Sequence, residues 1–360
     1  MPPLAANDKE DGAMPLDFTI YDRQTLMGVY REMGEVPNFW LSLAFQAQIN
    51  FEEESVDFGK ITEDRELAPL VMPMASGRPV EQEVETRFRV KPAYIKPKNP
   101  VSAADVIRRR AGLGELRPSA ALSNSARYNA LVANIVRKHR NAIERRWEWM
   151  AASAILNGAV TLEGPGYPTQ VVDFQRPANH TVVLGGGSRW GDSNVVPQDD
   201  LETWIDRVQE ADFGGPVTDV IFGPTAWRAY RETMKSEALT NMDVRQTNPV
   251  NIDLNVVTER VQFVGNISRN VRAWVYSDYY HVRGVKTNFM DPRDVVVFSP
   301  NVMGTRCFGA IIDLNSLAPT PVFPSMWMEN DPTAVMVMHQ SAPLMVPVNP
   351  ASTLRARVVA

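Results

Sequence analysis

Two segments of the chain repeat apolar residues every three to four positions, which is the spacing of a helix with one buried face. The first, residues 22–33, is short and precedes the helix-stopping Gly34 and Pro37. The second, residues 126–157, carries the clearest helical stripe in the chain, and Gly158 is placed to end it. The pattern therefore predicts one short helix near the amino terminus and one unusually long helix later.

Other segments alternate apolar and polar side chains, which is the spacing of a strand with one buried face. Residues 41–51 show this alternation throughout. Residues 66–92 predict a two-armed hairpin that turns near residues 75–79. An isolated hairpin of this length is only marginally stable in water, so it needs another surface to lie on, and a neighbouring subunit is one candidate. Residues 334–340 are apolar on both faces, as in a strand at the middle of a covered sheet.

Between these regions, short helical and strand patterns alternate over residues 195–301. The glycine-rich turn at residues 185–187 precedes them. This alternation predicts a separate α+β unit, after which the chain returns to the core that contains the long helix.

The composition is that of a folded, soluble protein. The chain has 360 residues, of which 44% are hydrophobic and 22% charged, and these values exclude wholesale disorder. The net charge of -5 gives no electrostatic reason to expect a dedicated nucleic-acid binder. The single cysteine and four scattered histidines argue against a disulfide framework or a zinc site. A single cysteine cannot form an internal disulfide, so a reducing compartment is expected. We find neither a secretory signal nor an apolar stretch long enough to span a membrane.

Candidate catalytic groups all have simpler explanations. The glycine-rich string at residues 185–191 lacks the Lys-Ser/Thr that a phosphate-binding loop requires. Asp199, Asp200 and Glu202 fall in the first turn of a predicted helix, where negative charge is stabilising. Cys307 is expected to be a buried apolar residue rather than a nucleophile. The sequence therefore predicts no enzyme, with no catalytic residues, no cofactor and no metal.

The predicted elements follow one another as an amino-terminal arm, a two-stranded ribbon, the long helix, an inserted α+β unit and a returning strand. Four short sequence strings occur along this series. They are YIKPK at 94–98, GVKTNF at 284–289, GTRCFG at 304–309 and QSAPLM at 340–345. Together with that order of elements, they resemble the major capsid proteins of lambda-type tailed bacteriophages over roughly residue 20 to the carboxyl end.

The resemblance implies an α+β chain with the Hong Kong 97-type capsid fold. Mapped onto the predicted elements, it divides the sequence into an N-terminal arm (1–55), an extended hairpin loop (56–97), a peripheral domain (98–194 and 302–360) with a spine helix (126–157), and an axial domain (195–301).

The resemblance also implies a function and a set of partners. A protein of this family self-assembles as hexamers and pentamers into the icosahedral head shell of a tailed phage. The shell encloses the packaged double-stranded DNA and expands from procapsid to mature head. The expected partners are further copies of the chain, a separate scaffold protein, a portal and a trimeric decoration protein. Proximity to DNA is expected to be non-specific, with no membrane involved and with assembly in the bacterial cytoplasm.

Residues on the arm and the ribbon are the expected contacts between subunits, because these segments have too little of their own body to pack on. We expect these contacts at Trp40, Phe45, Met72, Met74, Arg78 and Phe88.

Two other functions remain open at this point. One is an encapsulin-like nanocompartment shell, which would close into small cages around a cargo enzyme without a scaffold. The other is a carboxylate-dependent hydrolase that uses pairs among Asp199, Asp200, Asp219 and Asp253.

Overall fold

A computed structural model describes most of the chain, in ten segments. They are residues 20–32, 38–61, 85–107, 124–164, 167–192, 195–233, 260–267, 271–313, 319–331 and 333–360. Two compact units emerge from the contacts: Met1–Gly34, Lys96–Arg140 and Pro324–His339 form the first, and Glu35–Ile95, Asn141–Phe323 and Gln340–Ala360 form the second. Met72, Met74, Arg78 and the predicted turn of the long hairpin lie outside the described segments.

A three-stranded sheet organises the first unit, with β16 (Thr333–Gln340) between β15 (Phe323–Asn330) and β4 (Lys98–Ser102). β16 runs antiparallel to β4, with Ala334 opposite Ser102. The central position predicted for residues 334–340 is therefore confirmed. The short helices α1 (Arg23–Glu32) and α3 (Ala103–Ile107) belong to the same unit.

The predicted long helix is confirmed as α4 (Asn124–Asn157), whose residues are shared between the two units. It ends where the sequence indicates. Gly158 adopts a positive φ of 66°, and its N–H donates to the carbonyl oxygen of Ala154 at 3.0 Å. A Cβ atom at this position would lie 2.7 Å from the Cβ of Arg176, so only glycine fits the turn.

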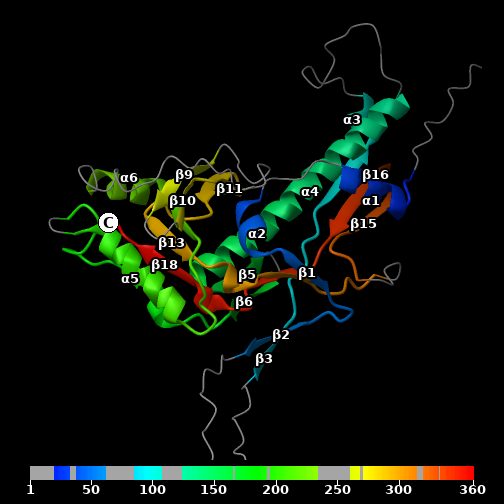
Figure 1. Ribbon diagram of the computed structural model, residues 1–360. Helices are drawn as coiled ribbons and strands as arrows, with labels where there is room; N and C mark the ends of the chain where they lie inside the picture. The colour runs from blue at the N-terminus through cyan, green and yellow to red at the C-terminus, as the bar shows by residue number, and fades with distance from the viewer. Residues whose placement is uncertain are drawn as a thin grey trace, which may run out of the picture. The chain divides into compact units, whose positions relative to one another are not determined.

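A six-stranded sheet forms the centre of the second unit (Figure 1). Its order is β7 (Thr181–Val183), β18 (Thr353–Arg357), β13 (Asp294–Phe298), β8 (Asp219–Phe222), β10 (Val271–Tyr276) and β9 (Val261–Ile267). β13 is antiparallel to both of its neighbours, whereas β8 and β10 run parallel.

Alternate residues of this sheet enter two different apolar clusters. Val220 and Phe222 of β8 join the cluster with α5 (Pro197–Glu210) and α6 (Pro224–Thr233). Ile221, between them, belongs to the other cluster, which contains α2 (Phe39–Ala44) and the end of α4. Because both faces are covered, the central strands are fully buried, with each large side chain contributing about 1.5–3 kcal/mol.

The carboxyl-terminal strand β18 is part of the six-stranded sheet. Residues 302–360 were predicted to belong to the peripheral domain, yet β18 pairs along its whole length with β13 of the predicted axial domain. Two ion pairs reinforce the pairing, because Arg355 and Arg357 both reach Asp294, at 2.7 and 2.8 Å. β7, which precedes residue 195, is also part of this sheet. The six-stranded sheet thus takes strands from both sides of the predicted boundaries at 195 and 301, and the division into axial and peripheral domains stays a prediction.

The predicted strand over residues 41–51 is wrong in its first half, where the structure has the helix α2. Trp40, Leu41 and Ala44 are spaced for one helix face and are buried, and this face outweighs the period-two alternation. A strand does follow, as β1 (Ala47–Asn50). It runs parallel to β14 (Thr305–Phe308), and β14 is antiparallel to β17 (Pro343–Val346).

Three two-stranded hairpins complete the second unit. They are β2 (Val56–Ile61) with β3 (Glu85–Val90), β5 (Ala159–Gly164) with β6 (Tyr167–Asp173), and β11 (Tyr279–Val282) with β12 (Val285–Asn288). The return arm of the predicted hairpin is thus found as β3, but its partner strand begins at Val56, well before residue 66. Short 3-10 turns occur at Ala178–His180, Pro300–Val302 and Pro350–Ser352.

None of the helices within the described segments has the length and apolar character needed to cross a membrane.

Candidate functional site

The carboxylates considered for catalysis are engaged in structural contacts. Asp219 is completely buried, where it pairs with Arg272 at 2.7 Å and accepts a hydrogen bond from the indole N–H of Trp274 at 2.8 Å. Asp200 accepts a hydrogen bond from the indole N–H of Trp190 at 2.9 Å. Asp253 lies outside the described segments. Asp200 and Asp219 are thus each held in a structural contact, and Asp199 lies in the first turn of the helix at Pro197–Glu210, where negative charge is stabilising.

Cys307 is a buried free thiol on β14, and burial raises its pKa to about 12. A thiol with so high a pKa is not a nucleophile at neutral pH. Within the segments that the structure describes, no three His, Cys, Asp or Glu side chains gather in a way that would hold a metal ion.

The most unusual charged group holds the amino-terminal segment to the long helix. Glu148 of α4 is 2% exposed, and its carboxylate accepts the backbone N–H groups of Trp40 at 2.8 Å and Leu41 at 3.0 Å. These are the second and third residues of α2, whose N-cap Asn38 makes no side-chain capping bond. Glu148 therefore provides, from a distant part of the chain, the cap that α2 lacks locally.

The other end of α2 is held by a positive charge. Arg306 of β14 donates from Nε to the carbonyl oxygen of Phe45 at 2.6 Å and from Nη2 to that of Leu41 at 3.4 Å. A carboxylate at the first turn and a guanidinium after the last turn both match the dipole of the helix. Six residues are too few to form a stable helix alone, so these two contacts fix α2 in place.

Burial raises the pKa of Glu148 to about 7, because an apolar environment disfavours the charged form. The two backbone N–H donors and the guanidinium of Arg145 act in the opposite direction, whereas the charge of Asp278 raises the pKa further. Asp278 is itself paired with Arg145 at 3.4 Å and Arg260 at 3.0 Å. The attachment of α2 thus depends on a group that titrates near neutral pH.

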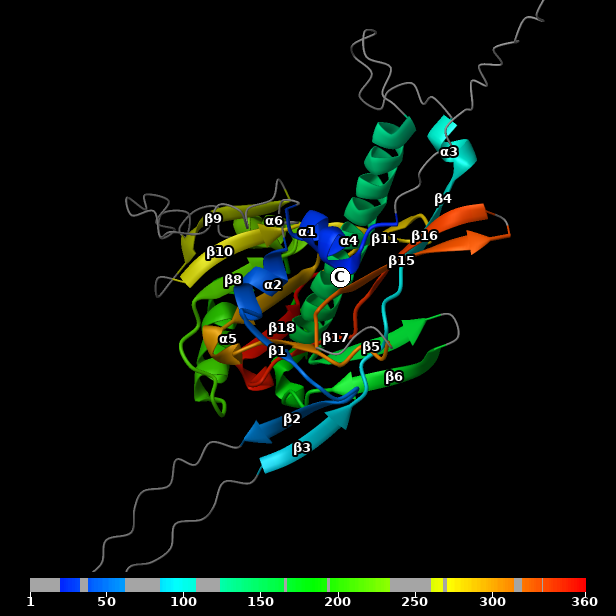
Figure 2. The same cartoon turned by 90° about the vertical axis from the view of Figure 1, so that its right-hand side faces the viewer.

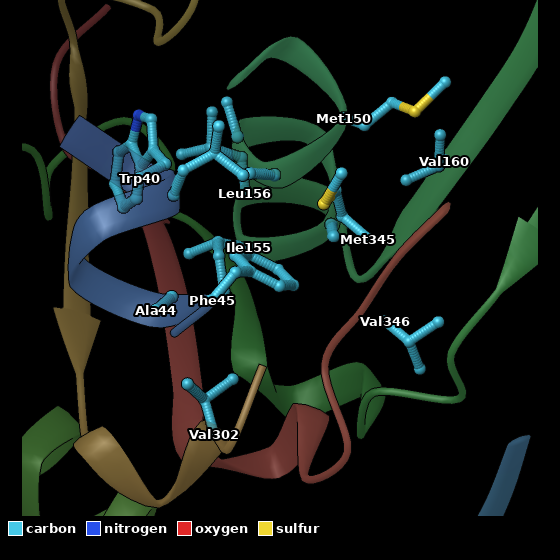
Figure 3. Packing of buried hydrophobic residues seen from close by; sticks show 14 of the residues in the cluster. Trp40, Ala44, Phe45, Met150, Ile155, Leu156, Val160, Val302, Met345 and Val346 are labelled. Atoms are coloured by element: carbon cyan, nitrogen blue, oxygen red, sulfur yellow. The ribbon is translucent and has the colours of Figure 1, made fainter. Parts of the chain in front are cut away.

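Trp40 and Phe45 were expected to contact a neighbouring subunit, and the structure corrects this. Both side chains are fully buried within the chain itself. Figure 3 shows them beside Ile155 and Leu156 of α4, and the Trp40 ring lies 5.4 Å from that of Tyr276. A side chain with no exposed surface has nothing to offer another copy, so both belong to the core.

Phe88, the remaining described residue of the predicted contact set, lies on β3. This strand pairs with β2 to form a two-stranded ribbon (Figure 2). Phe88 faces Phe58 across the two strands, with ring centroids 5.4 Å apart. Phe58 also packs on Phe174 at 5.8 Å, and both Phe58 and Phe88 keep part of their surfaces exposed. The contact of Phe88 with a second copy stays a prediction.

The ribbon is bordered by exposed ion pairs. Arg89 pairs with Glu53 and, at 3.1 Å, with Asp57, and Lys91 pairs with Glu54. Pairs this exposed contribute little to the stability of the chain, about 0–1 kcal/mol each.

A buried histidine pair lies in the first unit. The Nδ1 atoms of His139 on α4 and His339 on β16 are 3.0 Å apart, and Nε2 of His139 is 2.8 Å from Oδ1 of Asn99. If Nε2–H of His139 donates to Asn99, Nδ1 of His139 accepts a hydrogen bond from Nδ1–H of His339, and both rings are neutral. Burial lowers the pKa of His139 to about 4 and that of His339 to about 3.

Neither Glu148 nor the histidine pair was found from the sequence. One sequence signal could have indicated that Glu148 is buried: it lies one helical turn after Glu144. Both side chains are buried on α4. The histidines come from segments 200 residues apart, and no local pattern links them.

Comparison with known proteins shows the family to which the chain belongs. Residues 22–358 match the model of the family described as phage major capsid protein E. The chain belongs to this family.

Relatives of the family align with nearly the whole chain. The major capsid protein of Escherichia phage lambda is 25% identical over 343 residues, which cover 92% of this chain and 97% of that protein. The major capsid protein of Enterobacteria phage P21 is 26% identical over 342 residues, which cover 91% and 96%. The predicted resemblance to lambda-like capsid proteins is therefore confirmed.

A solved structure agrees with the fold. The putative capsid protein of a prophage of E. coli CFT073 superposes with a TM-score of 0.75 at 22% identity, covering 95% of this chain and all of that one. The predicted α+β capsid fold is confirmed, and membership of a structural protein family implies a non-enzymatic role.

Proposed function

We propose that this protein is the coat subunit of a tailed-phage head, and that it assembles as hexamers and pentamers into an icosahedral shell around double-stranded DNA. The observation that carries this proposal is the family match, which spans residues 22–358. The lambda and P21 proteins, which align over more than nine-tenths of this chain, are themselves named major capsid proteins.

The exposed elements are suited to such assembly. The ribbon of β2 and β3 is joined to the core through Phe58 and Phe174, and Asp57 and Arg89 on it are exposed. A two-stranded ribbon gains stability when a third surface covers it. A neighbouring copy of the chain supplies that surface in a shell.

The energetics of a shell favour many weak contacts. Burial of about 1,000 Å² per neighbour, half of it apolar, gives on the order of 12 kcal/mol. Association and ordering remove about 4–15 kcal/mol of that sum, so one contact between two copies is weak. Closed symmetry multiplies such contacts, and the subunit stays soluble until assembly begins.

The same proposal includes the partners of a phage head. A separate scaffold protein directs the procapsid, a portal occupies one vertex, and a trimeric decoration protein covers the expanded shell. The chain carries a net charge of -5, which limits adhesion of DNA to the inner wall and leaves only non-specific proximity. Assembly takes place in the bacterial cytoplasm, and the product is the virion capsid.

The experiment compares the full chain with a variant that lacks residues 68–82, expressed with and without candidate scaffold proteins from the same phage. Sedimentation velocity separates free subunits from closed particles. We expect particles from the full chain and folded free subunits from the deletion variant. Normal particles from the deletion variant would contradict the assigned role of the extended hairpin loop. Small cages formed without any scaffold would instead favour a nanocompartment shell.

A further inference from the structure

The hairpin of β11 and β12 ends in an exposed apolar tip. Val282 and Val285 face each other as the last pair of the hairpin, and 49% and 66% of their surfaces are exposed. Arg283 and Gly284 connect them with positive φ values of 50° and 83°. This is the backbone of a tight two-residue turn whose twist matches the strands, so the tip has a defined shape.

The base of the hairpin is held firmly by the second unit. The ring of Tyr280 lies 4.8 Å from that of Phe289, and its hydroxyl accepts the indole N–H of Trp149 at 3.2 Å. Arg145 donates to the carbonyl oxygen of Tyr279 at 3.1 Å. The exposed valines are therefore presented on an anchored stem, which lowers the entropy that a contact would cost.

The tip is also positively charged. Arg283 and Lys286 are exposed, and residues 279–288 contain no aspartate or glutamate. The Nζ atom of Lys286 lies 4.0 Å from the centre of the Tyr279 ring, which holds its charge beside the hairpin. A surface that complements this tip must be concave, partly apolar and negatively charged.

The second unit contains a cavity with these properties. Its volume is about 300 Å³, and it lies between the end of α5 and the 3-10 turns at Ala178–His180 and Pro350–Ser352. Ala211, Val348 and Pro350 supply apolar lining, and Glu210 and Asp212 are exposed on it.

The side chains that line the cavity carry more negative than positive charge. Arg207 contributes one positive charge, and it donates to the carbonyl oxygen of Asn179 at 2.9 Å. His180 is buried and bonded through Nδ1 to the carbonyl oxygen of Thr353 at 3.1 Å. Its pKa is lowered by burial, so it is neutral at pH 7. Two carboxylates thus face one guanidinium.

We propose that the tip formed by Val282 and Val285 in one copy of the chain occupies the cavity beside Glu210 in an adjacent copy. The proposal rests on the proposed self-assembly. The tip and the cavity are different surfaces of the same chain, so the contact is head-to-tail, which is the kind that closes into rings. Arg283 lies opposite Glu210 and Asp212, and this pairing selects the register between copies.

A charge-reversal cycle tests the pairing. Asp followed by Gly suits the turn, so Arg283→Asp preserves the hairpin. We expect Arg283→Asp and Glu210→Arg each to lower the assembled fraction about tenfold at low salt, because each places like charges in contact. The double variant is expected to recover most of the assembly. A double variant that assembles no better than the poorer single variant would overturn the proposal.

A disulfide test locates the contact. Val282→Cys and Ala211→Cys are introduced together in a Cys307→Ser background and oxidised after assembly. We expect bonds between copies, seen as ladders on non-reducing gels, and we expect none when Ala211→Cys is present alone. Chains carrying only Val282→Cys control for links between two tips. If the double variant forms closed particles but no disulfide links beyond those of the single variants, the proposed contact between tip and cavity is contradicted, whereas the proposed function is not. Failure of the unaltered chain to assemble under any condition contradicts the proposed function, and the inference with it.

Discussion

Replacing Glu148 with glutamine is expected to change how the stability of the free subunit depends on pH. The pKa of this buried carboxyl is about 7 in the folded chain, against 4.5 for an ordinary glutamate. The folded state therefore binds the proton more tightly. The stability linked to this group is fully present below pH 4.5 and is lost as the pH rises through 7. At about 1.4 kcal/mol per pKa unit, the loss is on the order of 3 kcal/mol.

The glutamine introduced by Glu148→Gln keeps the shape of the glutamate but cannot ionise. Its single oxygen can accept one of the two N–H groups of Trp40 and Leu41, and its own NH₂ faces the other. One buried N–H without an acceptor costs about 1–3 kcal/mol at every pH. Glu148→Gln should therefore be less stable than the unaltered chain at pH 5, and as stable or more stable at pH 8.

The assay is urea unfolding of the unassembled subunit at pH 5, 6, 7 and 8, followed by tryptophan fluorescence. The quantity that matters is the difference in unfolding free energy between variant and unaltered chain, because this difference removes the titration of all other groups. Glu144→Gln, one turn earlier on α4, is the matched control for replacing a buried carboxyl of this helix by an amide. A difference for Glu148→Gln that stays constant between pH 5 and pH 8 would refute the reasoning.

Three further predictions concern other buried or ribbon residues. Histidine in the unfolded chain has a pKa near 6.5, whereas buried His339 stays neutral to lower pH. The unfolded state therefore takes up a proton that the folded state does not, and stability should fall by about 2 kcal/mol between pH 6.5 and pH 5. His339→Phe should remove that loss in acid unfolding, and an unchanged acid profile would contradict the neutral pair. Phe88→Ala should lower the unfolding free energy by only about 1 kcal/mol but abolish particles in sedimentation, whereas Phe58→Ala should destabilise the subunit more, because Phe58 also packs on Phe174. Particles of normal yield from Phe88→Ala would place that ring outside the contacts. Asp219→Ala leaves the guanidinium of Arg272 without its buried partner and should cost about 3–5 kcal/mol in urea unfolding. A cost below about 1 kcal/mol, the value of an exposed pair, would show that the ion pair is not needed.

Features with a sustained period could be predicted from the sequence. The long helix is predicted to within two residues at its start and correctly at Gly158, because its stripe continues for many turns. The strand at residues 334–340 is predicted from apolar residues on both faces. The helix α1 is found for the same reason as α4, with Asp22 accepting the N–H of Thr25 at 3.2 Å.

Features that depend on distant partners could not be predicted. α2 has six residues, and its helical form relies on Glu148 and Arg306, which lie more than a hundred positions away. β18 has five residues and is defined by its pairing with β13. The burial of Trp40 likewise depends on Tyr276 and α4, so the sequence alone suggested a surface contact where the structure has core.

The measurement that tests the central claim most directly is electron microscopy of particles formed by the full chain together with its scaffold. We predict closed shells of icosahedral symmetry, in which density for the ribbon of β2 and β3 lies against a neighbouring subunit. Subunits that stay monomeric under every assembly condition, or closed shells in which the ribbon touches no neighbouring subunit, would contradict the account.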